Sequence, residues 1–357
     1  MTRYRPLRLI FFLTVVAFAT VIAPSVLRAA PPPGIPDGWS DGFVYANGIR
    51  IHYYHALPAP GKPVIVMVHG VTDNGLCWTT LTWKLQHDYD IYMLDTRGHG
   101  LSDPFTSADN GETLIKDVVE AVHALKLEKP ILLGHSMGAA TVMRIGAEYP
   151  DMARRVIMLD PLVGPGGFGG RRGPGAREPG RQGAPTNAAA SNATGINAIA
   201  RGNGDGAPPM RRRRGGPAPG GLPVNMFGSP EALVAQNNYS YDDLVAKARR
   251  ENPMWDMVDC QYWALSKKQF HGAYGSEGSQ AMNGAMNTGN SLAKITVPAL
   301  ILKAGAGVSA ETRQAMQDWV SGFKNVKLVY IDDAHHNLHH DQLKRTVEEL
   351  TAFLSTL

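Results

Sequence analysis

The chain has 357 residues, of which 44% are hydrophobic and only two are cysteines. That length allows one large domain or two small ones, and so few cysteines exclude a disulfide-stapled mini-domain and a cysteine-rich zinc protein. The net charge of +4 resolves into +4 on residues 1–30, +7 on residues 164–222 and −7 on the rest. The basic balance therefore lies in two peripheral segments, and it does not indicate a nucleic-acid partner.

Residues 1–30 have the composition of an export signal. Three arginines precede an uncharged apolar run at 9–27, and small residues and prolines follow it. This order is typical of a secretory signal peptide cleaved after Ala29 or Ala30. The alternative is an uncleaved membrane anchor, since the run is nearly long enough to span a bilayer. Either interpretation predicts a periplasmic or secreted protein, or one anchored at the inner membrane.

Residues 31–163 predict a hairpin followed by alternating strands and helices. Asn47-Gly48 separates two β-type runs, which is a strong hairpin signal. Short apolar runs then predict buried strands at 64–68, 91–94, 131–133 and 156–159, and helices are predicted through 78–85, 114–125 and 136–148. This alternation predicts an α/β fold with a mostly parallel sheet and an N-terminal antiparallel hairpin.

Residues 164–222 contain 17 glycines and 8 prolines in 59 positions and almost no large apolar side chains. Such a segment cannot bury enough surface to offset its ordering entropy, so it is predicted to be a disordered insertion. Its four consecutive arginines at 211–214 could bind an anionic polymer, but we favour a solvated spacer. Beyond it, helices are predicted at 230–250, 254–270 and 341–354, and strands at 299–302 and 328–331.

The segment 134–138, Gly-His-Ser-Met-Gly, directly follows the predicted strand at 131–133 and opens a predicted helix. In that context G-x-S-x-G is a nucleophile elbow. The turn is too tight for side chains at the two glycines, and it lifts the Ser136 hydroxyl to the carboxyl end of the sheet. There it meets a helix N-terminus, whose dipole favours developing negative charge. Ser136 is therefore the predicted nucleophile.

Two further motifs extend this pattern. His69-Gly70-Val71 ends the strand at 64–68, and residues 95–102 read Asp-Thr-Arg-Gly-His-Gly-Leu-Ser. With the elbow, these motifs resemble those of the α/β-hydrolase family. The resemblance covers 31–163 and 291–357, and it implies the α/β-hydrolase fold with a helical cap inserted at 223–290. In segment 95–102 it implies structural roles for Asp95, Arg97 and His99.

An oxyanion hole needs two N–H donors aimed at the attacked carbonyl oxygen. The elbow motif places one at Met137, directly after the nucleophile. The family resemblance places the other at Val71.

The general base is predicted among residues 332–341, which follow the last predicted strand and contain four histidines. The family usually has Gly-x-Gly-His here, and that alignment makes His336 the base. His335 stands at a glycine position of the motif and is the alternative. A zinc site is a further alternative, because His335/His339 and His336/His340 would be i,i+4 pairs on a helix. It needs additional ligands, so we predict no metal and no cofactor.

The acid of the triad is less clear. In much of the family it follows the strand that here runs over 299–302, but no carboxylate stands there before Glu311. Asp160 ends the predicted strand at 156–159, and some relatives take their acid from that strand. We therefore favour Asp160, with Glu311 as the alternative. Asp160 could also be a turn-forming residue before Pro161.

A serine nucleophile argues against epoxide hydrolase and haloalkane dehalogenase chemistry, for which relatives of this fold use Asp. It favours acyl transfer to water through an acyl-enzyme. The core motifs and cap residues 252–255 resemble small-substrate hydrolases of the N-formylmaleamate deformylase and carboxylesterase type. The prediction is thus an exported serine hydrolase of a small ester or amide. The alternatives are a non-hydrolytic relative, such as a cofactor-free oxygenase or lyase, and a surface binding protein with a decayed site.

Two smaller questions stay open in the sequence. Large apolar residues of the cap could line an acyl pocket together with Trp78, or they could form the cap's own core: Met254, Trp255, Met257, Tyr262, Trp263 and Phe270. Cys77 and Cys260 could form a disulfide in an exported protein, or they could be two buried thiols.

Overall fold

The computed structural model describes residues 31–165, 236, 238–271 and 276–356. The predicted signal at 1–30, the arginines at 211–214 and all but the first two residues of the predicted insertion lie outside this part. Within the described residues no helix is long and apolar enough to cross a membrane.

Eight strands form one sheet in the order β1-β2-β4-β3-β5-β6-β7-β8. They are β1 (Ser40–Ala46), β2 (Ile49–His55), β3 (Val64–Val68), β4 (Asp90–Leu94), β5 (Ile131–His135), β6 (Arg155–Leu159), β7 (Ala299–Ala304) and β8 (Val326–Ile331). Strand β2 is antiparallel to both β1 and β4, and all other neighbours are parallel. The predicted α/β-hydrolase fold, with its mostly parallel sheet and N-terminal antiparallel pair, is confirmed.

The hairpin has the predicted turn. Asn47 and Gly48 have φ values of 46° and 81°, and Ala46 pairs with Ile49. Positive φ at both central residues is the type I′ geometry, whose twist matches that of the two strands.

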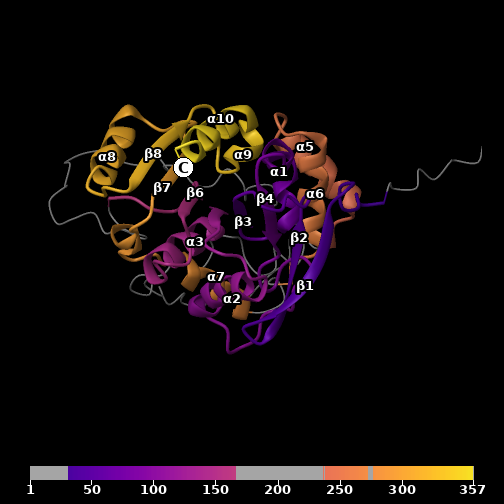
Figure 1. Cartoon of the computed structure of the whole chain (residues 1–357). Coiled ribbons are helices and arrows are strands. Elements are labelled where there is room, and N and C mark those ends of the chain that lie inside the picture. Colours follow the sequence, from indigo (N-terminus) through magenta and orange to yellow (C-terminus); the bar gives the residue numbers. More distant parts are fainter. Residues whose placement is uncertain (1–30, 166–235, 237, 272–275, 357) are drawn as a thin grey trace, which may run out of the picture. The chain divides into compact units, whose positions relative to one another are not determined.

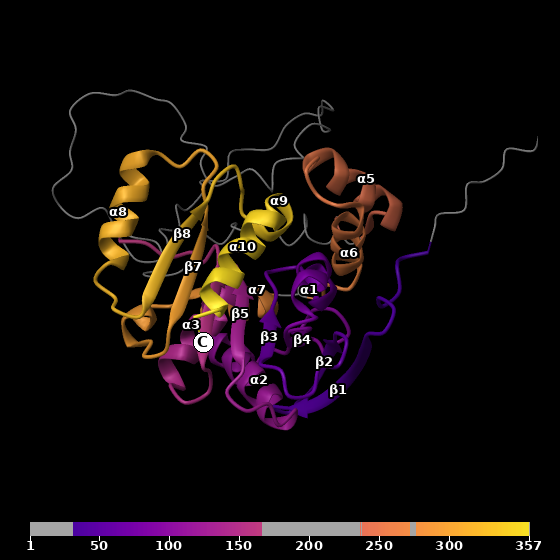
Figure 2. The same ribbon diagram turned by 45° about the horizontal axis from the view of Figure 1, so that its top comes forward.

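The central strands are buried on both faces, because helices cover the sheet on each side (Figures 1 and 2). Along β3, Val66 and Val68 pack into one hydrophobic cluster, whereas Ile65 and Met67 pack into the other. The first cluster includes residues of α2 (Gly111–Ala124), α3 (Met137–Glu148) and α8 (Ala310–Val320). The second includes residues of η1 (Gly75–Trp78), α1 (Thr79–Leu85), α9 (Leu338–Asp341) and α10 (Leu343–Leu354).

Three of the described helices between β6 and β7 stand apart from the sheet, and we call them the cap: α5 (Tyr241–Glu251), α6 (Met257–Lys268) and α7 (Ser276–Met286). Helices α5 and α6 pack on each other and α6 packs on η1 and α1, whereas α7 packs on α2 and α3 (Figure 2). A short helix, η3 (Ser291–Lys294), then leads into β7.

Two cap helices begin at capping side chains, and the start of the helix predicted at 230–250 lies outside the described residues. Ser240 accepts a hydrogen bond from the Asp243 N–H, so α5 begins at Tyr241. Asp256 does the same for Val258, so α6 begins at Met257. These capping side chains satisfy backbone donors that have no partner within the helix, and they set where each helix starts.

The order in which the chain visits β3, β4 and β5 sets the position of the candidate site. The chain passes from β3 to β4 on one side and then returns past β3 to β5 on the other. At such a switch point the loops leaving the carboxyl ends of the two strands diverge, and the crevice between them is where ligands bind in open α/β sheets. The loop after β3 carries Val71, and the loop after β5 carries Ser136.

Candidate active site

Ser136 occupies the turn between β5 and α3 in a strained conformation, with φ 53° and ψ −113°. A Cβ atom added at Gly134 would lie 2.1 Å from the Gly138 carbonyl oxygen, and one at Gly138 would lie 1.9 Å from the Val68 carbonyl oxygen. Both glycines are therefore sterically required. Strain of this kind costs on the order of 1–3 kcal/mol and persists where the surrounding structure holds it, typically at functional sites.

His336 lies in the loop after β8, and its Nδ1 is 2.6 Å from Oδ2 of Asp160. Asp160 directly follows β6, has φ 44°, and its N–H donates to the Leu302 carbonyl at 2.7 Å. An ionised carboxylate only accepts hydrogen bonds, so Nδ1 of His336 carries the proton and donates it. Nε2 is then left as an acceptor, which is the tautomer a general base needs.

Lys303, near the end of β7, is the second partner of the Asp160 carboxylate. Its Nζ lies 2.6 Å from Oδ1 of Asp160 and donates to the Pro161 carbonyl at 2.9 Å. Burial alone would raise the pKa of Asp160, but the hydrogen bond from His336 and the charge of Lys303 hold it well below its usual range. Asp160 therefore stays ionised throughout the neutral range.

The alternative acid and base lie elsewhere. Glu311 is exposed in the first turn of α8, where a hydrogen bond from its own backbone and one from Ser309 lower its pKa. The His335 side chain is 67% exposed, with Nδ1 3.7 Å from Oδ2 of Asp341. The structure thus places Asp160 against His336, in the arrangement that the sequence favoured.

The predicted oxyanion donors belong to the elbow and to the turn that follows β3. Residues 70–73 form a turn in which the Asp73 N–H donates to the Gly70 carbonyl at 3.2 Å. A Cβ added at Gly70 would lie 3.3 Å from Cβ of Ser136, so this turn abuts the elbow. Among the described residues, the N–H groups of Val71 and Met137 donate to no acceptor, which leaves both available to a developing oxyanion.

Four histidine rings contact one another in a row that begins with His336. Ring centroids are 4.8 Å apart between His336 and His135, 4.8 Å between His135 and His339, and 4.0 Å between His339 and His340. Burial, with a smaller contribution from the neighbouring His336, lowers the pKa of His135 to about 3. Burial also lowers the pKa of His339 well below its usual value. Burial opposes protonation of His340 too, but Asp259, with Oδ1 3.2 Å from Nδ1, raises its pKa.

The zinc alternative loses its geometric basis. Helix α9 begins only at Leu338, so His335 and His336 do not share a helix with His339 and His340. Within the described residues no group of three or more His, Cys, Asp or Glu side chains could hold a metal ion.

Asp95 and Arg97 hold the loop after β4 in shape, as the resemblance implied. Asp95 accepts from the Gly75 N–H at 2.7 Å and from the Leu101 N–H at 2.9 Å. Arg97 donates twice to Asp117, each time at 2.8 Å. The third residue, His99, is buried within the same loop, with Nδ1 2.9 Å from the Arg97 carbonyl.

The large cap residues mostly pack as a core. Trp255 and Trp263 pack with Cys260. Tyr262 of the cap and Trp78 of η1 pack in the second hydrophobic cluster of the sheet. Met254 and Met257 are exposed. Phe270 differs, because it packs in the cluster that contains Met137 and against which Val71 packs. Cys77 and Cys260 are separate buried thiols.

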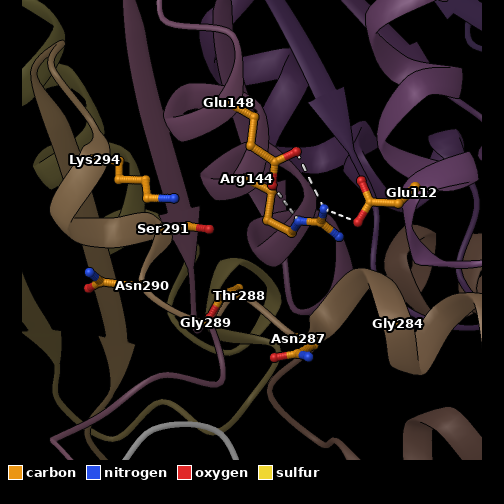
Figure 3. A pocket seen from close by; sticks show the side chains of 10 residues that line it. All are labelled: Glu112, Arg144, Glu148, Gly284, Asn287, Thr288, Gly289, Asn290, Ser291 and Lys294. Atoms are coloured by element: carbon orange, nitrogen blue, oxygen red, sulfur yellow. Dashed lines mark hydrogen bonds and ion pairs between the residues drawn. The ribbon is translucent and has the colours of Figure 1, made fainter.

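A polar pocket away from this site is lined by residues of α2, α3, α7 and η3, and none of the predicted catalytic residues lines it. Figure 3 shows that its two carboxylates are already paired: Arg144 lies between Glu148 and Glu112 and bonds to both. We assign it no role in catalysis.

A nucleophile elbow and a His–Asp pair at the carboxyl edge of a mostly parallel sheet define a hydrolase-type α/β protein. The chain belongs to the alpha/beta hydrolase family, whose model matches residues 65–349, more than half of its length.

Individual relatives match over shorter stretches. The chain is 39% identical over 128 residues to N-formylmaleamate deformylase of Pseudomonas putida, covering 35% of this chain and 47% of that protein. It is 32% identical over 98 residues to 2-(acetamidomethylene)succinate hydrolase of Mesorhizobium japonicum, covering 28% and 35%. It is 25% identical over 138 residues to epoxide hydrolase 1 of Caenorhabditis elegans, covering 38% and 34%. The matched stretches thus span between a third and a half of these relatives.

Solved structures agree on the fold. The crystal structure of an N-formylmaleamic acid deformylase from Pseudomonas putida matches 87% of this chain and all of its own, with a TM-score of 0.57 and 20% identity. That of E-2-(acetamidomethylene)succinate hydrolase matches 89% and 99%, with a TM-score of 0.59 and 17% identity.

Proposed function

We propose that this protein is an exported serine hydrolase that cleaves a small carboxylic ester or amide through an acyl-enzyme on Ser136. The observation that carries the proposal is the 2.6 Å contact between Nδ1 of His336 and Oδ2 of Asp160, at the same sheet edge as the elbow. That contact supplies a base of the correct tautomer where the family places one, and it argues against a decayed site.

The proposed reaction has two halves. Nε2 of His336 takes the proton of the Ser136 hydroxyl as Oγ bonds to the carbonyl carbon, and the N–H groups of Val71 and Met137 bind the resulting oxyanion. The oxyanion collapses, the bond to the leaving alcohol or amine breaks, and His336 gives that group its proton. A water then adds to the acyl-enzyme by the same steps, which releases the acid and restores Ser136.

The names of two relatives narrow the substrate class. N-formylmaleamate and 2-(acetamidomethylene)succinate both carry an N-acyl group on a small organic acid. We therefore propose small N-acyl amides beside simple esters as substrates. The epoxide hydrolase relative carries less weight, because Ser136 holds the position of the nucleophile.

The decisive experiment is labelling with a fluorophosphonate probe, followed by mass spectrometry of the labelled peptide and a screen of p-nitrophenyl esters and N-formyl and N-acetyl amides. We expect the label on Ser136 and a fall in kcat of at least about a thousandfold in Ser136→Ala. Substantial turnover in Ser136→Ala that is lost in His336→Ala would instead favour the oxygenase or lyase alternative.

The acid is tested separately on one hydrolysed ester. Asp160→Asn should lower kcat by up to about four decades, because an amide NH₂ can donate to Nδ1 and stabilise the wrong tautomer of His336. Glu311→Gln serves as the matched control and should leave kcat unchanged. A larger loss in Glu311→Gln would reassign the acid.

Export is a proposal of its own. It rests on the arginines, apolar run and alanines of residues 1–30. The protein should be recovered from the periplasmic fraction with an N-terminus after Ala29 or Ala30, whereas an uncleaved membrane-bound chain would favour the anchor.

A further inference from the structure

The cap contributes a buried charge to the active-site region. Lys267, in the last turn of α6, has a side chain only 3% exposed. Its Nζ donates to the Thr72 carbonyl at 3.0 Å, to the Thr72 hydroxyl at 2.9 Å and to Oδ1 of Asp73 at 2.8 Å. A lysine ammonium has three N–H donors, so all three are used on two adjacent residues. The ring of Trp263 lies beside the same ammonium, with its centroid 4.8 Å from Nζ.

These bonds converge on the turn that holds a predicted oxyanion donor. Thr72 has φ 65°, a left-handed conformation that is sterically costly for a β-branched residue. Val71 precedes it within the same turn, so a change in the Thr72 backbone would move the neighbouring peptide groups, the Val71 N–H among them. Lys267 holds the carbonyl and the hydroxyl of Thr72, and thereby holds the turn.

Asp73 links the same lysine to the elbow. Its Oδ1 binds Lys267, while its Oδ2 lies 4.0 Å from Nδ1 of His135, the residue before the nucleophile. Burial alone would raise the pKa of Asp73, but the charge of Lys267 lowers it to about 2. The carboxylate is therefore ionised and paired with the cap lysine at neutral pH.

Other contacts dock α6 on the core without Lys267. The Thr80 hydroxyl donates to Asp259 at 2.7 Å, and the Tyr262 hydroxyl donates to the Gly34 carbonyl at 2.8 Å. The bonds of Lys267 are thus not needed simply to attach the helix.

We propose that Lys267 is a positioning residue for the oxyanion hole, through which the cap sets how well the enzyme binds its transition state. The inference rests on the proposed function and deepens it. Lys267 touches neither substrate nor reacting atoms. It acts by keeping the Val71 N–H aimed at the position the oxyanion will occupy.

The test compares Lys267→Met with Lys267→Arg on an ester that the wild type hydrolyses. Lys267→Met keeps most of the side-chain volume but loses the charge and all three donors. We expect its kcat to fall about tenfold to a hundredfold with KM within about threefold, because a misaimed donor weakens transition-state binding and not ground-state binding. Lys267→Arg retains a charged donor and should recover part of kcat.

Lys268→Met is the matched control, because Lys268 is exposed on the same helix and donates to the Tyr239 carbonyl at 2.9 Å. Its kcat should stay within about twofold of wild type. Thermal unfolding of each variant reports folding. Should Lys267→Met not fold, Lys267→Gln keeps one donor for Thr72 without the charge, and its kcat should fall likewise.

The outcomes separate the two proposals. A wild type that takes no fluorophosphonate label on Ser136 overturns the proposed function. A labelled, active wild type beside a folded Lys267→Met or Lys267→Gln with unchanged kcat overturns the role of Lys267 alone. A rise in KM with unchanged kcat does so too, since it would place Lys267 in substrate binding.

Discussion

At the scale of single residues, Asp160 is the best-defined part of the site. Its Oδ2 faces Nδ1 of His336 at 2.6 Å and its Oδ1 faces Nζ of Lys303 at the same distance. The carboxylate therefore has two partners at once, and the charge of Lys303 is one of the reasons why the pKa of Asp160 lies below its usual range.

This arrangement predicts a change in how the stability of Lys303→Met depends on pH. The charge of Lys303 helps to hold the pKa of Asp160 below its usual range, so the ionised carboxylate stabilises the folded state above the unfolded pKa of about 4, and this contribution is lost as the pH falls. Between pH 7 and pH 3, Lys303→Met should therefore lose less free energy of unfolding than wild type, by up to about 1 kcal/mol in urea denaturation at each pH. The exposed Lys324→Met variant is the control and should lose as much as wild type. An equal loss in Lys303→Met would contradict the assigned pairing.

At the scale of elements, the sequence predicted those whose pattern is local. The apolar runs of β3, β5 and β6 lie where they were predicted, and so does the elbow. Helix α8 escaped prediction, because it buries only Met316 and Val320 and so shows a weak apolar stripe. Helix α7 escaped because its glycines look like helix breakers.

One of those glycines, Gly284, is required by a close contact between two helices. A Cβ added at Gly284 would lie 2.8 Å from the Gly111 nitrogen, and one at Gly111 would lie 2.2 Å from the Gly284 carbonyl carbon. Two glycines thus let α7 and α2 approach closely, which local propensity cannot reveal. Lys267 was likewise beyond the sequence, because it contacts Thr72 across 195 positions.

The geometry of the elbow predicts that one added methyl group strongly destabilises the folded protein. In Gly138→Ala the new Cβ would lie 1.9 Å from a backbone oxygen of β3, and no side-chain rotation relieves that clash. We expect the free energy of unfolding to fall by about 3 kcal/mol or more, measured by urea denaturation. Gly34→Ala meets no atom within 4 Å and should unfold like the wild type. Equal stability of the two variants would argue against the elbow geometry.

At the scale of the whole molecule, the buried histidines make folding sensitive to acid. His135 and His339 are buried, and both pKa values are lowered by that burial. An unfolded chain protonates them near pH 6.5. Below that pH the unfolded state binds more protons, so the free energy of unfolding falls as the pH falls. His340 has a raised pKa, so its contribution changes above pH 6.5 and not below.

Removing one of these buried histidines should make the free energy of unfolding depend less on pH in the acid range. Each buried neutral histidine reduces the free energy of unfolding by up to about 1.4 kcal/mol per pH unit below pH 6.5. His339→Gln should therefore lose about 2 kcal/mol less than wild type between pH 6.5 and pH 5, in urea denaturation at each pH. The exposed His335→Gln variant should show the wild-type slope. An unchanged slope in His339→Gln would mean that the folded protein protonates His339 readily.

The proposed catalytic residues are also joined through the sheet. The Ser136 N–H donates to the Leu159 carbonyl at 3.0 Å, the Asp160 N–H to the Leu302 carbonyl at 2.7 Å, and the Gly305 N–H to the Ile331 carbonyl at 2.9 Å. The ends of β5, β6, β7 and β8 are thus joined by successive backbone hydrogen bonds, which hold the proposed nucleophile, acid and base on one framework. The cap touches the segment after β8 through Asp259 at His340 and Trp255 at Asp341, and it holds the turn after β3 through Lys267. A change in the cap can therefore reach the proposed oxyanion donor at Val71 without passing through the strand ends that carry Ser136 and Asp160.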